Sequence, residues 1–199
     1  MFHKLFRKAQ EIVYLPSYKE GSEVVSKFQK ELSNLHSPKV LELGTLQWNP
    51  GVSTHHGDWL PADAAFVKSD VEAGGDVDVV ADAHDLNPFE DEEFDVFMAH
   101  SVWEHLRKPW IAAQAAHRVL KPGGILFIDT HFVFPLHGYP SDYCRWTTEG
   151  LLGLFDEPEW ADRIAGYSYP TSIKKPPEIK VWNELAPCFL NVSIFARRA

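Results

Sequence analysis

Residues 39–45 have the sequence KVLELGT, a short apolar run that holds one carboxylate and ends in a glycine. Its three aliphatic side chains suit a strand that is buried on both faces, as in a parallel sheet. Glu42 does not, because a buried carboxylate needs a partner that offsets its desolvation. Gly44 allows the backbone to leave the sheet and approach another group closely. The stretch therefore predicts a strand with a ligand site at its carboxyl end.

Further apolar runs predict an α/β fold around this strand. We expect strands at residues 65–71, 77–81, 94–99, 125–129 and 191–197, the last paired with a strand near 164–168. An apolar stripe predicts a helix at residues 110–121, which the sequence PGG then ends. Strands that alternate with helices or crossovers predict a doubly wound, mostly parallel sheet.

The segment after the first strand is expected to differ from a usual crossover. Residues 46–64 contain two prolines and two glycines, which predict a long ordered loop with at most one helical turn. His55, His56 and Asp58 lie close enough in sequence to suggest a metal site. Adjacent histidines in a loop usually point apart, so no metal is expected here.

Two helices precede the first strand, so residues 1–37 are expected to form a helical extension and residues 38–199 the main domain. Residues 1–13 have the pattern of a basic amphipathic helix. Such a helix can lie on an anionic membrane surface, but packing on its own domain or on a second subunit is favoured. A second apolar stripe that includes Phe28 and Leu32 predicts another helix, ended before Pro38.

The charge distribution restricts the class of partner. The chain of 199 residues has 28 acidic and 19 basic side chains, and residues 69–106 contain no Lys or Arg. This balance argues against nucleic acid and fits a small cationic or neutral ligand. Only two cysteines occur, without zinc-site spacing, and no apolar run reaches membrane-spanning length. A cytoplasmic protein is expected.

The ordered segments KVLELGT, FVKSD, VVADAHDL, FDVFMAHSVWEHL and RVLKPGGILFIDT resemble the class I S-adenosylmethionine-dependent methyltransferases, in particular the type 11 group. The resemblance covers roughly residues 38–155. It implies a Rossmann-like, doubly wound, mostly parallel seven-stranded sheet whose last strand is antiparallel. It also implies S-adenosyl-L-methionine as the cofactor.

The resemblance assigns the cofactor contacts to the ends of four strands. It places the methionine end at Glu42 and Gly44, the ribose at Asp70, adenine at Asp82 and Ala83 with His84 adjacent, and the sulfonium side at His100 and Ser101. These residue types suit the ligand, because a carboxylate supplies the acceptor pair that a ribose diol needs. A sulfonium is a cation, which an acidic or aromatic surround favours.

One position departs from the family pattern. Leu46 stands where the family usually has a second glycine, and this also removes the G-x-G-x-x-G fingerprint of nicotinamide enzymes. The methionine end of the pocket must then be built differently. An alternative function therefore stays open, that of a non-catalytic Rossmann-like binding or partner subunit that has lost activity.

The sequence HSVWEH, residues 100–105, could be mistaken for a zinc motif. Its two histidines miss the H-x-x-E-H spacing by one residue. We interpret the segment as the start of a helix, with Glu104 and His105 in structural roles.

Residues 131–146, HFVFPLHGYPSDYCRW, follow the fifth predicted strand and are expected to cover the cofactor crevice. His131, His137 and Tyr139 are the candidates for a catalytic base. We interpret the segment as a roof over the substrate; the alternative is a surface loop packed by its own aromatic side chains.

Two charged residues of the same segment are candidates for substrate binding. Arg145 offers a planar fork suited to a carboxylate or phosphate, and Asp142 lies close to it in sequence. Arg145 can instead anchor the loop by pairing with Asp142. The predicted function is methyl transfer to a small-molecule or sugar-like acceptor.

Overall fold

A computed structural model of the protein describes residues 19–138, 140–173, 177–178 and 188–199. The amphipathic helix expected at residues 1–13 and the base candidate Tyr139 lie outside the described residues. No helix of the described part is long and apolar enough to cross a membrane.

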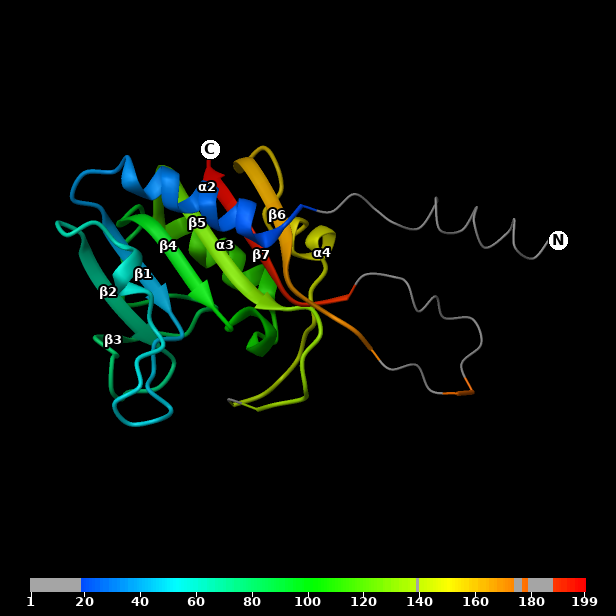
Figure 1. The fold of residues 1–199 in the computed structure, drawn as a ribbon. Coiled ribbons are helices and arrows are strands. Elements are labelled where there is room, and N and C mark those ends of the chain that lie inside the picture. Colours follow the sequence, from blue (N-terminus) through cyan, green and yellow to red (C-terminus); the bar gives the residue numbers. More distant parts are fainter. Residues whose placement is uncertain (1–18, 139, 174–176, 179–187) are drawn as a thin grey trace.

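Seven strands form one mixed, mostly parallel sheet in the order β3-β2-β1-β4-β5-β7-β6 (Figure 1). The strands are β1 (Lys39–Leu43), β2 (Ala65–Asp70), β3 (Val79–Val80), β4 (Phe94–His100), β5 (Leu120–His131), β6 (Trp160–Thr171) and β7 (Cys188–Arg198). β7 runs antiparallel to both β5 and β6. The expected Rossmann-like, doubly wound sheet is confirmed.

β1, which contains most of the KVLELGT stretch, lies in the middle of the sheet. β1 pairs in parallel with β2 on one side and with β4 on the other. β5 continues the parallel order beside β4. The carboxyl ends of these four strands therefore meet at one edge, where their loops project together in Figure 1.

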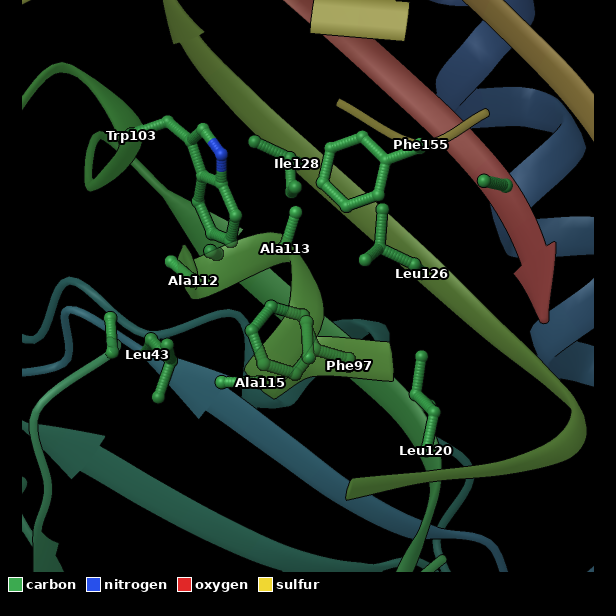
Figure 2. Packing of buried hydrophobic residues seen from close by; sticks show 14 of the residues in the cluster. Leu43, Phe97, Trp103, Ala112, Ala113, Ala115, Leu120, Leu126, Ile128 and Phe155 are labelled. Atoms are coloured by element: carbon green, nitrogen blue, oxygen red, sulfur yellow. The ribbon is translucent and has the colours of Figure 1, made fainter. Parts of the chain in front are cut away.

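One face of the sheet is covered by α3 (Pro109–Val119) and by the 3₁₀ helix η2 (Trp103–His105). Figure 2 shows the packing on this face, where alanines of α3 lie against the side chains of Leu43 and Phe97, and Trp103 lies nearby. The short side chains of α3 allow the helix to approach the strands closely.

The other face is covered by α2 (Gly21–Ser33), which buries Val24, Phe28 and Leu32 as its apolar stripe predicts. The Phe28 ring lies 4.9 Å from the Phe127 ring of β5 and 6.3 Å from the Trp59 ring, between centroids. Trp59 belongs to the loop after β1, so the helix and this loop together form the second layer.

That loop, residues 44–64, contains only one helical turn, η1 (Gly57–Trp59), as expected. It leaves the sheet at Gly44, whose φ is +81°. A Cβ atom at this position would lie 2.5 Å from Cγ2 of Val102, so both the backbone angle and the space require glycine.

Some expected bounds were wrong by a few residues. The helix ends at Val119 and not at residue 121, because Leu120 already pairs with Phe94 at the start of β5. The third strand is reduced to Val79–Val80. The short helix α4 (Thr148–Leu152) begins after Thr147, whose side chain caps it by accepting a hydrogen bond from the backbone N–H of Gly150 at 3.0 Å.

Phe28 joins the parts of the second layer, so its substitution should strongly affect the stability of the protein. We expect Phe28→Ala to lower the free energy of unfolding by about 3–5 kcal/mol, because it removes a fully buried ring that joins α2 to both β5 and Trp59. Gln29→Ala, on the exposed side of the same helix, is the control and should change it by less than about 0.5 kcal/mol. Denaturant unfolding measures both. Equal effects of the two substitutions would show that α2 is not docked in this way.

Candidate active site

A cavity of about 950 Å³ lies at the carboxyl edge of the sheet. Its walls come from the ends of β1, β2, β4 and β5 and from the loops that follow them. Asp70 and Asp82 line one part, and His131 and His137 line another. The cavity therefore joins the residues predicted for the cofactor to those predicted for the acceptor.

Seven of the eight positions predicted for the cofactor line this cavity: Gly44, Asp70, Asp82, Ala83, His84, His100 and Ser101. Asp70 accepts hydrogen bonds from the backbone N–H groups of Leu46 and Glu72, at 3.1 and 3.3 Å. Asp82 Oδ1 accepts one from the backbone N–H of His84 at 2.8 Å. Burial raises the pKa of Asp82, but the bonds from His84 outweigh this and hold that pKa below its usual range. Both carboxylates are thus fixed at the cavity edge.

Leu46, the departure from the family pattern, does not line the cavity. Its side chain is buried against Gly74, where an added Cβ would lie 2.3 Å from Leu46 Cδ1. The neighbouring Thr45 donates a hydrogen bond to the Asp76 carbonyl at 2.7 Å, which ties the loop to the segment between β2 and β3. The larger side chain is therefore accommodated beside the pocket and leaves the cofactor side open.

Glu42, the eighth position, is almost fully buried behind the cavity wall. His56 binds both of its oxygens: the backbone N–H donates to Oε2 at 2.9 Å, and Nδ1 lies 2.7 Å from Oε1. The His56 ring stacks on the ring of His100 with centroids 3.4 Å apart. His56 and Trp59 also line the cavity, although neither was predicted from the sequence to contact the cofactor. The wall at which the methionine end is predicted is therefore built partly from the long loop, by aromatic side chains.

His100 contributes an unsatisfied polar atom to this wall. Its Nε2 is buried and has no hydrogen-bond partner among the described residues. Burial and the nearby His56 hold the pKa of His100 well below its ordinary value, so the ring is neutral at neutral pH. The cavity thus presents a neutral imidazole with one nitrogen lacking a hydrogen-bond partner, together with the carboxylates at its edge. Such a wall fits a polar ligand that carries both hydrogen-bond donors and hydrogen-bond acceptors.

The acceptor part of the cavity holds a second buried acid, Glu104 of η2. Its Oε2 accepts a hydrogen bond from the Thr130 hydroxyl at 2.7 Å, and its Oε1 lies 3.0 Å from His131 Nε2. His137 Nε2 is 4.0 Å from the same oxygen, and His105 Nε2 is 3.9 Å from it. We refer to Glu104, His105, His131 and His137 as the imidazole cluster. Sequence reasoning missed Glu104 as a member, because its partners lie far along the chain.

Burial and pairing act in opposite directions on this cluster. Burial raises the pKa of Glu104, but His131, a backbone hydrogen bond and the Thr130 hydroxyl together lower it by more, so the carboxyl group is ionised at neutral pH. Burial lowers the pKa of His131, and Glu104 more than reverses this. The cluster thus concentrates negative charge on one carboxylate and attracts a cation or proton to the histidine side.

Asp142 and Arg145, predicted to bind substrate, do not line the cavity. Arg145 makes a short ion pair with Asp142 and donates to the carbonyls of Cys144, Phe134 and Pro135 at 2.7, 3.3 and 3.2 Å. The pairing holds the pKa of Asp142 far below its usual range. These contacts favour the alternative interpretation, in which Arg145 anchors the loop; the substrate role stays a prediction.

Comparison with known proteins relates the middle of the chain to a family. Residues 58–128 match the family model Methyltransf_11, a methyltransferase domain. No curated protein matches the sequence significantly.

Several solved structures have the same fold. An S-adenosylmethionine-dependent methyltransferase from Archaeoglobus fulgidus is 14% identical, with a TM-score of 0.59 and 100% of both chains covered. The YcgJ protein from Bacillus subtilis is 13% identical, with a TM-score of 0.62, covering 89% of this chain and 98% of that one. A third, an S-adenosylmethionine-dependent methyltransferase from Aquifex aeolicus, is 14% identical, with a TM-score of 0.52 and coverage of 87% and 89%.

The chain therefore shares its fold with solved S-adenosylmethionine-dependent methyltransferases. Together with the match of residues 58–128 to a methyltransferase domain, this agrees with the resemblance to the type 11 group and with S-adenosylmethionine as its cofactor. The residues present fit this group, because the cavity offers two fixed carboxylates, a glycine-bounded turn and an unpaired imidazole nitrogen.

The low pKa of His100 predicts a pH dependence of stability. Between an unfolded-state pKa of about 6.5 and the lower folded-state value, the unfolded chain binds one more proton than the folded chain. His100 therefore contributes a loss of stability as the pH falls below about 6.5, at up to about 1.4 kcal/mol per pH unit. Unfolding of the protein and of His100→Gln, measured from pH 7.5 to 5, should give a shallower slope for the variant. Identical slopes would contradict a neutral, buried His100.

The contacts of Arg145 predict a structural effect. Arg145→Met keeps length but removes the ion pair with Asp142 and the bonds to three carbonyls. We expect a loss of about 1–3 kcal/mol in the free energy of unfolding and faster proteolysis within residues 131–146. Unchanged stability and proteolysis would instead return Arg145 to the substrate role.

Proposed function

We propose that the protein transfers a methyl group from S-adenosylmethionine to a hydroxyl group of a small, sugar-like acceptor. The observation that carries this proposal is the continuous cavity, which has carboxylates suited to the cofactor in one part and the imidazole cluster in another. S-adenosylmethionine supplies a methyl group on an activated sulfonium; its C–S bond breaks, sulfur keeps the electron pair, and the acceptor oxygen gains the methyl group. The chain must therefore align the two reactants and remove the acceptor's proton.

The cofactor half of the proposal rests on the ends of β2 and β4 and on the segment after β3. Asp70 presents a fixed carboxylate for the ribose diol, and Asp82 and Ala83 lie where adenine is expected. His100 and Ser101 lie at the end of β4, where the sulfonium side is expected. Glu42 acts here as a positioning residue, since it holds His56 in the cavity wall.

The acceptor half rests on His131 and His137, which line the cavity and surround a buried carboxylate. A hydroxyl group must lose its proton during methyl transfer, and groups of this kind are suited to promote that loss. A purely apolar acceptor would make no hydrogen bond to these polar groups of the cavity wall. This is why we favour a hydroxylated, sugar-like molecule.

The rival function, a binding subunit without activity, drew its support from Leu46 and from the missing crossover helix. Leu46 is turned away from the cavity, and the long loop contributes His56 and Trp59 to its wall. Both features are therefore compatible with an open cofactor pocket. The buried acids and histidines of the acceptor part favour catalysis, because a scaffold does not require them.

Cofactor binding can be tested through Asp70. S-adenosylhomocysteine should bind with a Kd in the micromolar range, about −8 kcal/mol. Asp70→Ala should weaken it by roughly 1–3 kcal/mol, because the ribose diol loses its acceptor. Asp91→Ala, an exposed acid paired with Arg118 outside the cavity, is the control and should bind as the wild type does. Calorimetry measures both. Absence of binding to the wild-type protein at millimolar ligand would support the rival function.

Activity is tested by following S-adenosylhomocysteine release from S-adenosylmethionine with a set of monosaccharides and other polyols. Acceptor-dependent release is expected. Release with amine acceptors alone would overturn the hydroxyl assignment while leaving methyl transfer intact.

A further inference from the structure

Three histidine nitrogens surround one buried carboxylate oxygen in the acceptor part of the cavity. Oε1 of Glu104 lies 3.0 Å from His131 Nε2, 3.9 Å from His105 Nε2 and 4.0 Å from His137 Nε2. Glu104 is 0% exposed, and within the described residues this oxygen has no hydrogen-bond partner, since the His131 contact is close without being aligned as a hydrogen bond. A fully buried carboxylate oxygen without a bond requires an explanation.

The other nitrogen of each ring faces an oxygen acceptor. Nδ1 of His105 lies 2.5 Å from the Ser141 carbonyl, Nδ1 of His137 lies 3.1 Å from the Pro135 carbonyl, and Nδ1 of His131 lies 3.2 Å from Asn191 Oδ1. The Asn191 amide is oriented by its own donation to Asp129 at 2.5 Å. With Nδ1 donating to these acceptors, Nε2 on the Glu104 side carries a proton in the metal-free ring and binds an ion through its lone pair once the ion displaces that proton. Histidines that bind metals are oriented in this way.

We propose that Glu104, His131 and His137 form a binding site for one divalent transition-metal ion such as Zn²⁺, with His105 beside it. One ligand atom from each of the three lies within 4.8 Å of the others. Bonds of about 2.0–2.1 Å to a tetrahedral ion place neighbouring ligand atoms roughly 3.3 Å apart. Glu104 Oε1 lies 3.0 Å from His131 Nε2 and 4.0 Å from His137 Nε2, one distance below this value and one above it. Small side-chain movements therefore suffice to bring the three ligand atoms into place around an ion. Binding of the ion does not depend on the proposed function.

A second group, formed by Glu42, His56 and His100, has ligand atoms equally close together but is less suited to an ion. His56 already binds both oxygens of Glu42. The rings of His56 and His100 are stacked with 17° between their planes. Lone pairs lie in the ring planes, so those of two stacked rings run side by side and do not converge on one point.

The choice of ion follows from the ligands. Imidazole and carboxylate together suit Zn²⁺ and its transition-metal neighbours, whereas Mg²⁺ and Ca²⁺ require mainly oxygen ligands. His131 and His137 both line the cavity, so an ion between them keeps a coordination position open toward the acceptor. The Thr130 hydroxyl holds the second oxygen of Glu104 and fixes the carboxylate plane.

The role of such an ion rests on the proposed function. A hydroxyl group coordinated to it has a lowered pKa and loses its proton to water near neutral pH. His131 and His137 would then serve as ligands, and the ion would replace them as the group that activates the acceptor.

The test is calorimetric titration of the full chain, stripped with a chelator and dialysed, with Zn²⁺ and in parallel with Mg²⁺. We expect one Zn²⁺ per chain and no binding of Mg²⁺. His137→Ala, at a partly exposed ring, should weaken Zn²⁺ at least about tenfold, and Glu104→Gln should do the same. His36→Ala, at an exposed histidine outside the cavity, and His56→Ala in the second group should bind as the wild type does. Circular dichroism checks that each variant is folded.

No Zn²⁺ binding by the folded wild-type protein overturns the inference. So does loss of binding in His56→Ala with retention in His137→Ala, because the ion would then lie at the second group. S-adenosylhomocysteine is titrated into the same stripped protein. If it binds while Zn²⁺ does not, the metal site fails and the proposed function stands; if Zn²⁺ binds and methyl transfer is absent, only the proposed function fails.

Discussion

The bond between Glu42 and His56 is the interaction on which the cofactor side of this structure depends. A carboxylate that is almost fully buried in the central strand has both oxygens bound by one residue of the following loop. Removing either partner would leave a buried charge or polar group unpaired. The bond therefore holds the loop across the end of β1, where it places Trp59 against Phe28 and Phe127. This one hydrogen-bonded pair anchors the loop in the place of a crossover helix.

This arrangement explains why the fold was largely predictable from the sequence. Burial on both faces requires continuous apolar runs, and those of β1 and β4 are easily recognised. Adjacent parallel strands end at the same edge, so the convergence of Asp70 and Asp82 on one cavity followed from the order of the strands. Local chemistry was also sufficient for the Thr147 cap, because the capping bond spans only three residues.

The parts that could not be predicted depend on contacts between distant segments. The need of Glu42 for a partner was evident, but the identity of that partner depends on the path of an irregular loop. The direction of Leu46 likewise depends on Gly74, which leaves room for it only in the folded chain. Glu104 is interpretable as an ordinary helical residue until Thr130 and His131 are brought to it by β5. The spacing of residues along the chain carries no signal for such pairs.

The two buried acids at this edge differ in how completely they are satisfied. Glu42 has both oxygens bound by His56, so it stabilises one loop conformation. Glu104 has one oxygen bound by Thr130 and one that faces several imidazoles without an aligned hydrogen bond. A buried charge left partly unsatisfied costs stability, and such costs are concentrated where a protein does chemistry. The cavity wall is therefore fully hydrogen-bonded at Glu42, where we expect the cofactor, and only partly so at Glu104, where we propose that the acceptor binds.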